Sequence, residues 1–95
     1  MIKHIVFFKL KDSSPESVLR TANVLRDMED RIPQLISLEV GIDVIRSERS
    51  YDISLITEVH SLEDLQAYQV HPVHQEVIKH MNEFKESSIA VDYEL

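Results

Sequence analysis

The sequence predicts an α+β fold in which helices cover one face of a four-stranded antiparallel sheet. Three observations indicate it: segments with a two-residue apolar period, segments with a helical apolar period, and their order along the chain, strand–helix–strand–strand–helix–strand. The chain of 95 residues suits one domain, so we expect residues 1–95 to share a single hydrophobic core.

The first strand is expected at residues 2–10 and is apolar on both faces in its middle. One face carries Ile2, His4, Val6, Phe8 and Leu10. Ile5 and Phe7 lie on the other face. A strand of this kind needs cover on both sides, so we expect helices over the first face and either more helices or a partner's sheet over the second. His4 is a polar group on an apolar face and must find a hydrogen-bond partner.

The first helix is expected to begin at Ser13-Ser14-Pro15-Glu16, which combines a serine cap, a proline in the first turn and Glu16 three residues after Ser13. Apolar residues then recur at helical spacing at Val18, Ala22, Leu25, Met28 and Ile32. Pro33 is expected to end this helix.

Two alternating segments, residues 35–44 and 51–60, predict a β-hairpin joined by the polar connection at residues 46–50. Gly41, the single glycine of the chain, lies inside the first of them and indicates a bulge or bend. A short helix capped by Ser61 and ending near Tyr68 follows, then a helix from Pro72 to about Glu86 and a last strand over residues 89–95. This order is that of the ferredoxin-like βαββαβ sandwich.

Composition narrows the classes of function. A formal net charge of −7 without a cluster of Lys or Arg argues against nucleic acid. No segment reaches about 18 apolar residues, and no signal-like apolar run opens the chain, so we expect no membrane partner. The absence of cysteine fits a reducing cytoplasm and excludes a thiol nucleophile or cysteine-bound zinc.

The stretch from Tyr68 to His74, where two histidines flank Pro72, is the strongest candidate for a functional site in the sequence. Pro72 ends one helix and begins another, which places His74 in the first turn of the new helix, where the helix dipole favours a neutral imidazole. A neutral, half-buried imidazole is a useful acid or base, although a histidine on an apolar helix face is commonly a hydrogen-bonded core residue. A metal site is not expected, because His71 precedes the helix and no carboxylate lies at ligand spacing within this stretch.

Four groups of residues together resemble the stress-responsive A/B barrel (Dabb) family along essentially the whole chain: Lys3-His4-Ile-Val-Phe, Ile32-Pro33 with Gly41, Tyr68-x-x-His71-Pro72-x-His74, and Val91-Asp92-Tyr93. The resemblance implies a homodimer in which two four-stranded sheets stack into a barrel. It also implies that His4 and His74 face a cavity between helices and sheet, with Tyr68 as neighbour and no clear role for His71. The sequence departs from the polyketide cyclase branch at Leu19, Ala22 and Ile53, which argues against a large aromatic substrate.

We therefore expect a small-molecule pocket lined by Phe8, Leu55 and Val77, with His71 beside the substrate. His4 and His74 would form an acid/base pair, and Tyr68 would orient a developing enolate or donate to it, in cofactor-free cyclase, lyase or isomerase chemistry next to a carbonyl. The alternative is a non-catalytic dimeric protein whose histidines satisfy each other in the core. A haem- or oxygen-handling barrel is a third possibility.

Overall fold

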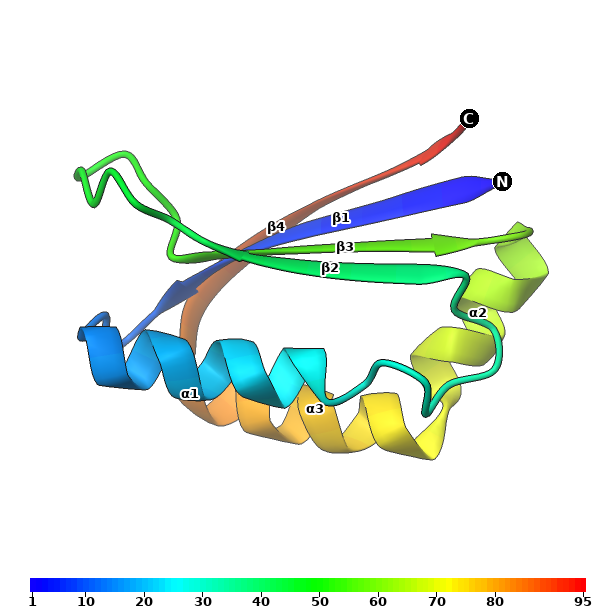
Figure 1. The fold of residues 1–95 in the computed structure, drawn as a ribbon, viewed down its shortest axis with the longest axis horizontal. Helices are drawn as coiled ribbons and strands as arrows, with labels where there is room; N and C mark the ends of the chain where they lie inside the picture. Colours follow the sequence, from blue (N-terminus) through cyan, green and yellow to red (C-terminus); the bar gives the residue numbers. More distant parts are fainter.

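A four-stranded antiparallel sheet forms the centre of the computed structural model, which describes residues 1–95. The elements are β1 (Ile2–Leu10), α1 (Pro15–Arg26), β2 (Ser37–Ile42), β3 (Ile53–Val59), α2 (Leu62–Val70), α3 (Pro72–Phe84) and β4 (Lys85–Glu94). The strands lie in the order β2-β3-β1-β4. All three helices lie on one side of the sheet (Figure 1). The ferredoxin-like fold is therefore confirmed, with α2 and α3 together in the place of the second helix.

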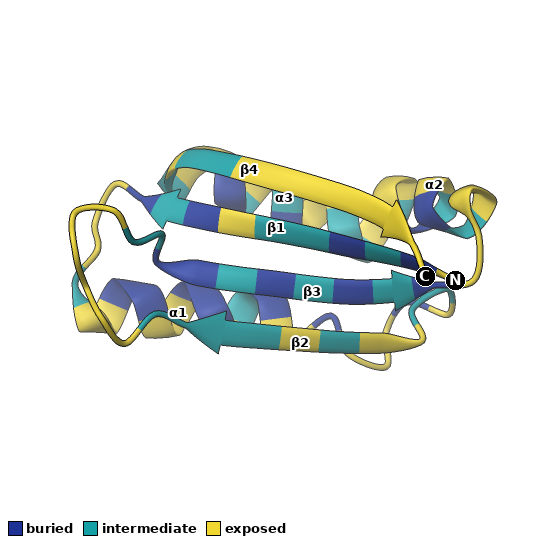
Figure 2. Ribbon diagram, turned by 90° about the horizontal axis from the view of Figure 1, so that it is seen from above, coloured by how far each residue is buried: buried dark blue, intermediate teal, exposed yellow.

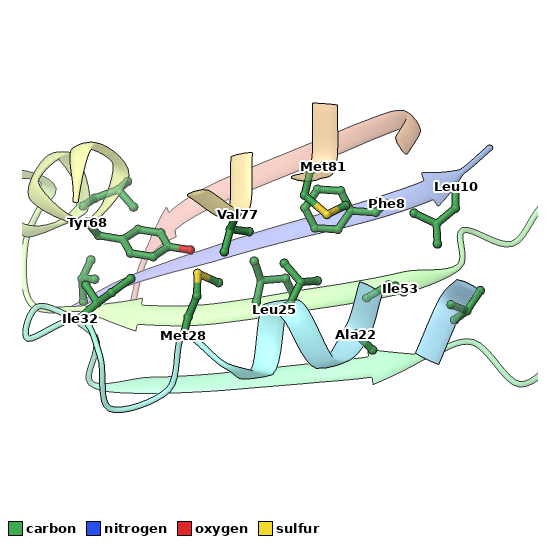
Figure 3. Close-up of a cluster of buried hydrophobic side chains, with 14 of the residues drawn as sticks. Phe8, Leu10, Ala22, Leu25, Met28, Ile32, Ile53, Tyr68, Val77 and Met81 are labelled. Carbon is green, nitrogen blue, oxygen red and sulfur yellow. The ribbon is translucent and has the colours of Figure 1, made fainter. Parts of the chain in front are cut away.

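The hydrophobic core lies between the sheet and the helices (Figure 3). Its largest contributions come from alternate residues of β1 and β3 and from the inner faces of the helices: Ile2, Phe8, Leu10, Val18, Ala22, Leu25, Met28, Ile53, Leu55, Val59, Tyr68, Val77 and Met81. The apolar side chains at every second residue of β1 and β3 thus form the sheet face that the helices cover.

Helix α1 begins with a serine cap and a proline in its first turn, as predicted, but ends earlier than expected. Ser14 is the N-cap, and its Oγ accepts a hydrogen bond from the Ser17 N–H at 3.3 Å. The prediction that the helix continues to Ile32 is wrong: it ends at Arg26 and gives way to turns, with Asp30 at a φ of 65°. A residue in the left-handed conformation cannot continue a right-handed helix. Ile32 is nevertheless buried, so the apolar residues of the sequence keep a helical spacing beyond the end of the helix.

The hairpin strands β2 and β3 are each shorter than their alternating segments. Val44, the last residue of the first alternating segment, lies in the connection and is 86% exposed. Buried Asp52 fixes this connection, because its Oδ2 accepts from the Leu10 N–H at 2.7 Å and its Oδ1 accepts from Arg46 Nη1 at 3.0 Å.

The bulge predicted at Gly41 is absent, since β2 and β3 pair in continuous register from Ser37 to Ile42. A Cβ on Gly41 would come within 2.9 Å of Ser54 Oγ on the neighbouring strand, so close approach is what the glycine permits. The register shift of this sheet lies instead between β1 and β4, at Lys9 and Leu10. Strand β4 itself begins at Lys85, directly after α3, four residues before the predicted start at Ile89.

The sheet face opposite the helices, which we call the open face, is uncovered in the chain (Figure 2). Ile5 and Phe7 lie on it, as predicted. Cross-strand pairing adds Ile56 from β3 and Ile89, Val91 and Tyr93 from β4. Phe7, Ile89, Val91 and Tyr93 are 40%, 50%, 61% and 40% exposed. None of the helices has the length and apolar character needed to cross a membrane.

Candidate functional site

The junction between α2 and α3 positions three of the predicted residues. His71 adopts an extended conformation between the two helices, as expected for a residue before proline. Its Nδ1 accepts a hydrogen bond from the Val73 N–H at 3.1 Å, so the imidazole serves as the N-cap of α3. His71 does not line the cavity described below, and its position does not support the expected contact with a substrate.

Tyr68 lies between the other two predicted histidines. Its ring centroid is 4.4 Å from that of His74 and 6.1 Å from that of His4, with an edge-to-face arrangement toward His4. The three side chains come from α2, α3 and β1. The structure therefore brings together the trio that the sequence singled out.

His4 is buried and hydrogen-bonds to Asp92, its cross-strand partner on β4, through Nδ1 and Oδ1. The carboxylate accepts from Nδ1–H and so fixes the orientation of the ring, which leaves Nε2 free to face a ligand. Sequence reasoning missed Asp92 as a site residue. The alternation of the last strand could have indicated that Asp92 faces the helices. The register of β4 against β1 was needed to place it opposite His4.

His74 is half-buried, and its Nδ1 donates to the Gln69 carbonyl oxygen at 2.9 Å. Burial lowers the pKa of His74; the Gln69 hydrogen bond opposes this shift, and the nearby His4 and His71 rings add to it. The ring is therefore neutral near pH 7, with a lone pair on Nε2. Because His4 and His74 each hydrogen-bond another group, they do not satisfy each other, as the non-catalytic alternative had assumed.

A cavity of about 170 Å³ lies between α3 and the sheet. Both histidines line it together with the three predicted apolar residues, Phe8, Leu55 and Val77, and seven of its 11 lining residues are hydrophobic. The volume is below the roughly 300 Å³ at which drug-sized pockets begin. It suits a molecule with the bulk of about six waters, at about 30 Å³ per water.

Tyr68 is fully buried beside this cavity and is not one of its lining residues. Figure 3 shows its hydroxyl directed from α2 toward Val77. Neither this hydroxyl nor that of Thr57 has a hydrogen-bond partner within the chain. Burial raises the pKa of Tyr68, and the neighbouring Thr57 hydroxyl offsets only part of that rise. Tyr68 is thus a neutral phenol that holds the two imidazoles apart.

The remaining polar groups of the cavity, Asn82 and Lys85, were not predicted. Both come from the end of α3 and the start of β4, a region that the sequence pattern assigned to one longer helix. No group of three or more His, Asp or Glu side chains in the chain lies in metal-binding geometry.

The fold and the cavity define a ferredoxin-like α+β protein with room for a small molecule under its sheet. The chain belongs to the stress responsive A/B barrel domain (Dabb) family, whose model matches residues 2–95. It is 26% identical over 102 residues to the stress-response A/B barrel domain-containing protein DABB1 of Arabidopsis thaliana, covering 98% of this chain and 46% of that protein. The chain thus spans about half the length of this relative.

Two solved structures illustrate the fold. A dimeric protein of unknown function from Bacteroides fragilis is 35% identical, with a TM-score of 0.84 over 99% of this chain and 95% of its own. The hydroxynitrile lyase of Passiflora edulis is 18% identical, with a TM-score of 0.82 over 97% of this chain and 90% of its own. At that identity the likeness to the lyase concerns the fold alone.

Proposed function

We propose that this protein binds a small carbonyl compound in the cavity between α3 and the sheet and moves a proton at the carbon next to the carbonyl. The observation that carries the proposal is the arrangement of His4 and His74, which line one cavity while their Nδ1 atoms are engaged elsewhere. Nε2 is therefore the nitrogen that each ring has left for a ligand in this space.

The two rings suit opposite roles. His74, held neutral by burial, takes the proton from the carbon through Nε2. His4, oriented by Asp92, gives a proton from Nε2 to the carbonyl oxygen when its ring is in the charged form, so that the pair converts a ketone into its enol and back. Tyr68 positions both rings and does not touch the ligand.

Deuterium exchange tests this role directly. In D₂O, we expect the protein to accelerate exchange of the protons next to the carbonyl of cyclopentanone, followed by proton NMR, and we expect His74→Gln to lose at least about tenfold of that acceleration. His60→Gln is the matched control, because His60 is exposed at the end of β3 and lies outside the cavity. Equal exchange with wild type, His74→Gln and buffer alone would refute the catalytic role.

A binding protein without catalysis is the second candidate. It is favoured by the full burial of the Tyr68 hydroxyl, which keeps the only phenol near the histidines away from the ligand. Binding of cyclopentanone without any exchange would support this candidate.

We further propose that the protein forms a homodimer through its open face. Phe7, Ile89 and Val91 are exposed large apolar side chains that neighbour one another on this face, and contiguous apolar surface of this kind commonly marks an interface. A hollow of about 380 Å³ beside Phe7, Gly41 and Tyr51 lies on the same surface and would be covered by a second copy. The similar Bacteroides fragilis protein is dimeric, which supports a dimer here.

A further inference from the structure

We propose that the ligand of this cavity carries a carboxylate, held by Lys85 and Asn82 at the end of the cavity away from the two histidines. The inference rests on the proposed function for the position of the reacting carbonyl. It adds the chemical class of the ligand: a small oxo acid, with its carbonyl at the histidines and its negative charge at Lys85.

The cavity has two distinct polar ends joined by apolar walls. Along α3, His74 and Asn82 are roughly two turns apart, or about 12 Å at 1.5 Å per residue, and both line the cavity. Along β1, His4 and Phe8 are about 13 Å apart at 3.3 Å per residue, and Lys85 lies at the Phe8 end. These are separations along the backbone, and the imidazole and lysine side chains that line the cavity span part of them. A ligand that reaches both ends therefore needs one polar group at each, separated by a short carbon chain.

A register shift in β4 is what places a cation at this end. Ser87 pairs with Lys9, and a regular ladder would next pair Glu86 with Leu10, whose side chain is on the helix side. Lys85 is the residue opposite Leu10 instead, and Glu86 is the extra residue of the shift. The irregularity thus replaces a carboxylate by an ammonium group beside the cavity.

Lys85 retains donors for a ligand. The chain has three side-chain ion pairs, His4–Asp92, Asp27–Arg31 and Arg46–Asp52, and Lys85 takes part in none. The one hydrogen bond of its side chain is to Ser88 Oγ, at the long distance of 3.4 Å, whereas an ammonium group carries three donors. The Asn82 side chain lines the cavity without a hydrogen bond in the chain and offers a second donor group.

The overall charge of the protein does not oppose a single carboxylate at this position. The net charge of −7 is spread over the surface, and salt screens exposed charges beyond about 8 Å. No carboxylate lines the cavity, and Asp92, which lies opposite His4, is engaged by that residue. One ammonium group and a cavity of about 170 Å³ match a singly charged group better than a bulky, doubly charged phosphate.

A pair of probes of nearly equal shape tests the inference: 4-oxopentanoate and its uncharged amide, 4-oxopentanamide. We expect wild type to bind the acid about tenfold more tightly than the amide at low salt, measured by ligand-observed NMR titration, because a charge-assisted hydrogen bond to Lys85 is available only to the acid. In Lys85→Met the two affinities should become equal, and Lys85→Arg should restore part of the preference.

Lys79→Met is the matched control, because Lys79 is an exposed lysine of α3 outside the cavity, and it should keep the full preference. Thermal unfolding of each variant verifies the fold, with Lys85→Gln as a second neutral variant. An undiminished preference in Lys85→Met and Lys85→Gln, or no preference in wild type, would overturn the inference. Deuterium exchange in the amide distinguishes failure of this inference from failure of the proposed function. If exchange occurs but the acid is not preferred, the histidine chemistry is supported and the carboxylate site is refuted. If the acid is preferred but no exchange occurs, the carboxylate site is supported and the histidine chemistry is refuted.

Discussion

Burial decides the protonation state of His74 and makes the stability of the protein depend on pH. The folded protein holds the pKa of this ring below 6.5, its ordinary value in an unfolded chain. As the pH falls through 6.5, the unfolded chain therefore takes up a proton before the folded protein does. The free energy of unfolding should consequently decrease as the pH falls below about 6.5 and should gain nothing from this group above that pH.

Replacing the ring isolates this contribution. His74→Gln keeps a polar side chain without a titrating group, so its stability should decrease less between pH 7.5 and 5 than that of wild type. Urea unfolding at both pH values measures the difference, and His60→Gln, at an exposed histidine, should follow wild type. Parallel pH curves for wild type and His74→Gln would contradict the assignment of His74 as a neutral, partly buried base.

The junction of α2 and α3 depends on His71 as a cap. His71→Ala should remove the hydrogen bond to the Val73 N–H and lower the free energy of unfolding by about 1 kcal/mol, the usual cost of losing an N-cap. His71→Asn should retain most of that stability, because asparagine is among the best N-cap residues. Urea unfolding of the two variants measures this, with Ser61→Ala at the cap of α2 as a comparison.

The exchange assay separates structural and ligand roles of the same residue. A cap should affect exchange only through the position of His74, so His71→Asn should keep both stability and exchange. If His71→Asn keeps its stability but loses exchange or ligand binding, the imidazole contacts the ligand, and the cap is not its main role.

The positions of most helices and strands could be predicted from the sequence, because the side chains that are buried between sheet and helices are apolar and recur with the period of each element. Strand β1 was predicted to the residue, and the Pro72 junction was predicted because proline restricts its own backbone and that of His71. The end of α1 was not, since Ile32 is buried from a turn as well as it would be from a helix. Periodicity reports burial and leaves the backbone conformation open.

The cavity could be predicted only where a single element determines the position of a residue. Phe8 and Leu55 follow from strand alternation, and His74 and Val77 from the inner face of α3. Asp92 and Lys85 depend on the pairing of β4 with β1 and on the register shift between them, which are tertiary features. The two histidines of the cavity were therefore accessible from the sequence, and the partner of His4 and the cation were not.

The whole molecule is a two-layer structure whose sheet has a covered face and a bare one. The helices cover one face of the sheet and leave the other bare (Figure 2). His4 lies on the covered face, while Ile5 and Phe7 face outward from the same strand. A chain of 95 residues buries only about 60 to 65% of its unfolded surface, so covering the open face with a second copy would extend a small core. Stable interfaces of this kind bury about 800 Å² on each partner.

Phe7→Glu tests the dimer and its contribution to stability together. Phe7 is 40% exposed in the single chain and lies between Ser54 and Ile89, in the middle of the open face. A carboxylate there would be buried without a partner in the dimer, so we expect the variant to sediment as a monomer while wild type sediments as a dimer at micromolar concentration. The melting temperature of the variant should fall, and that of wild type should rise with protein concentration, because association stabilises only the folded chain.

Leu19→Glu provides the control: it places the same charge on an exposed leucine of α1, away from the sheet, and should leave the dimer intact. A wild-type monomer whose melting temperature is independent of concentration would show that the open face is not an interface between two copies.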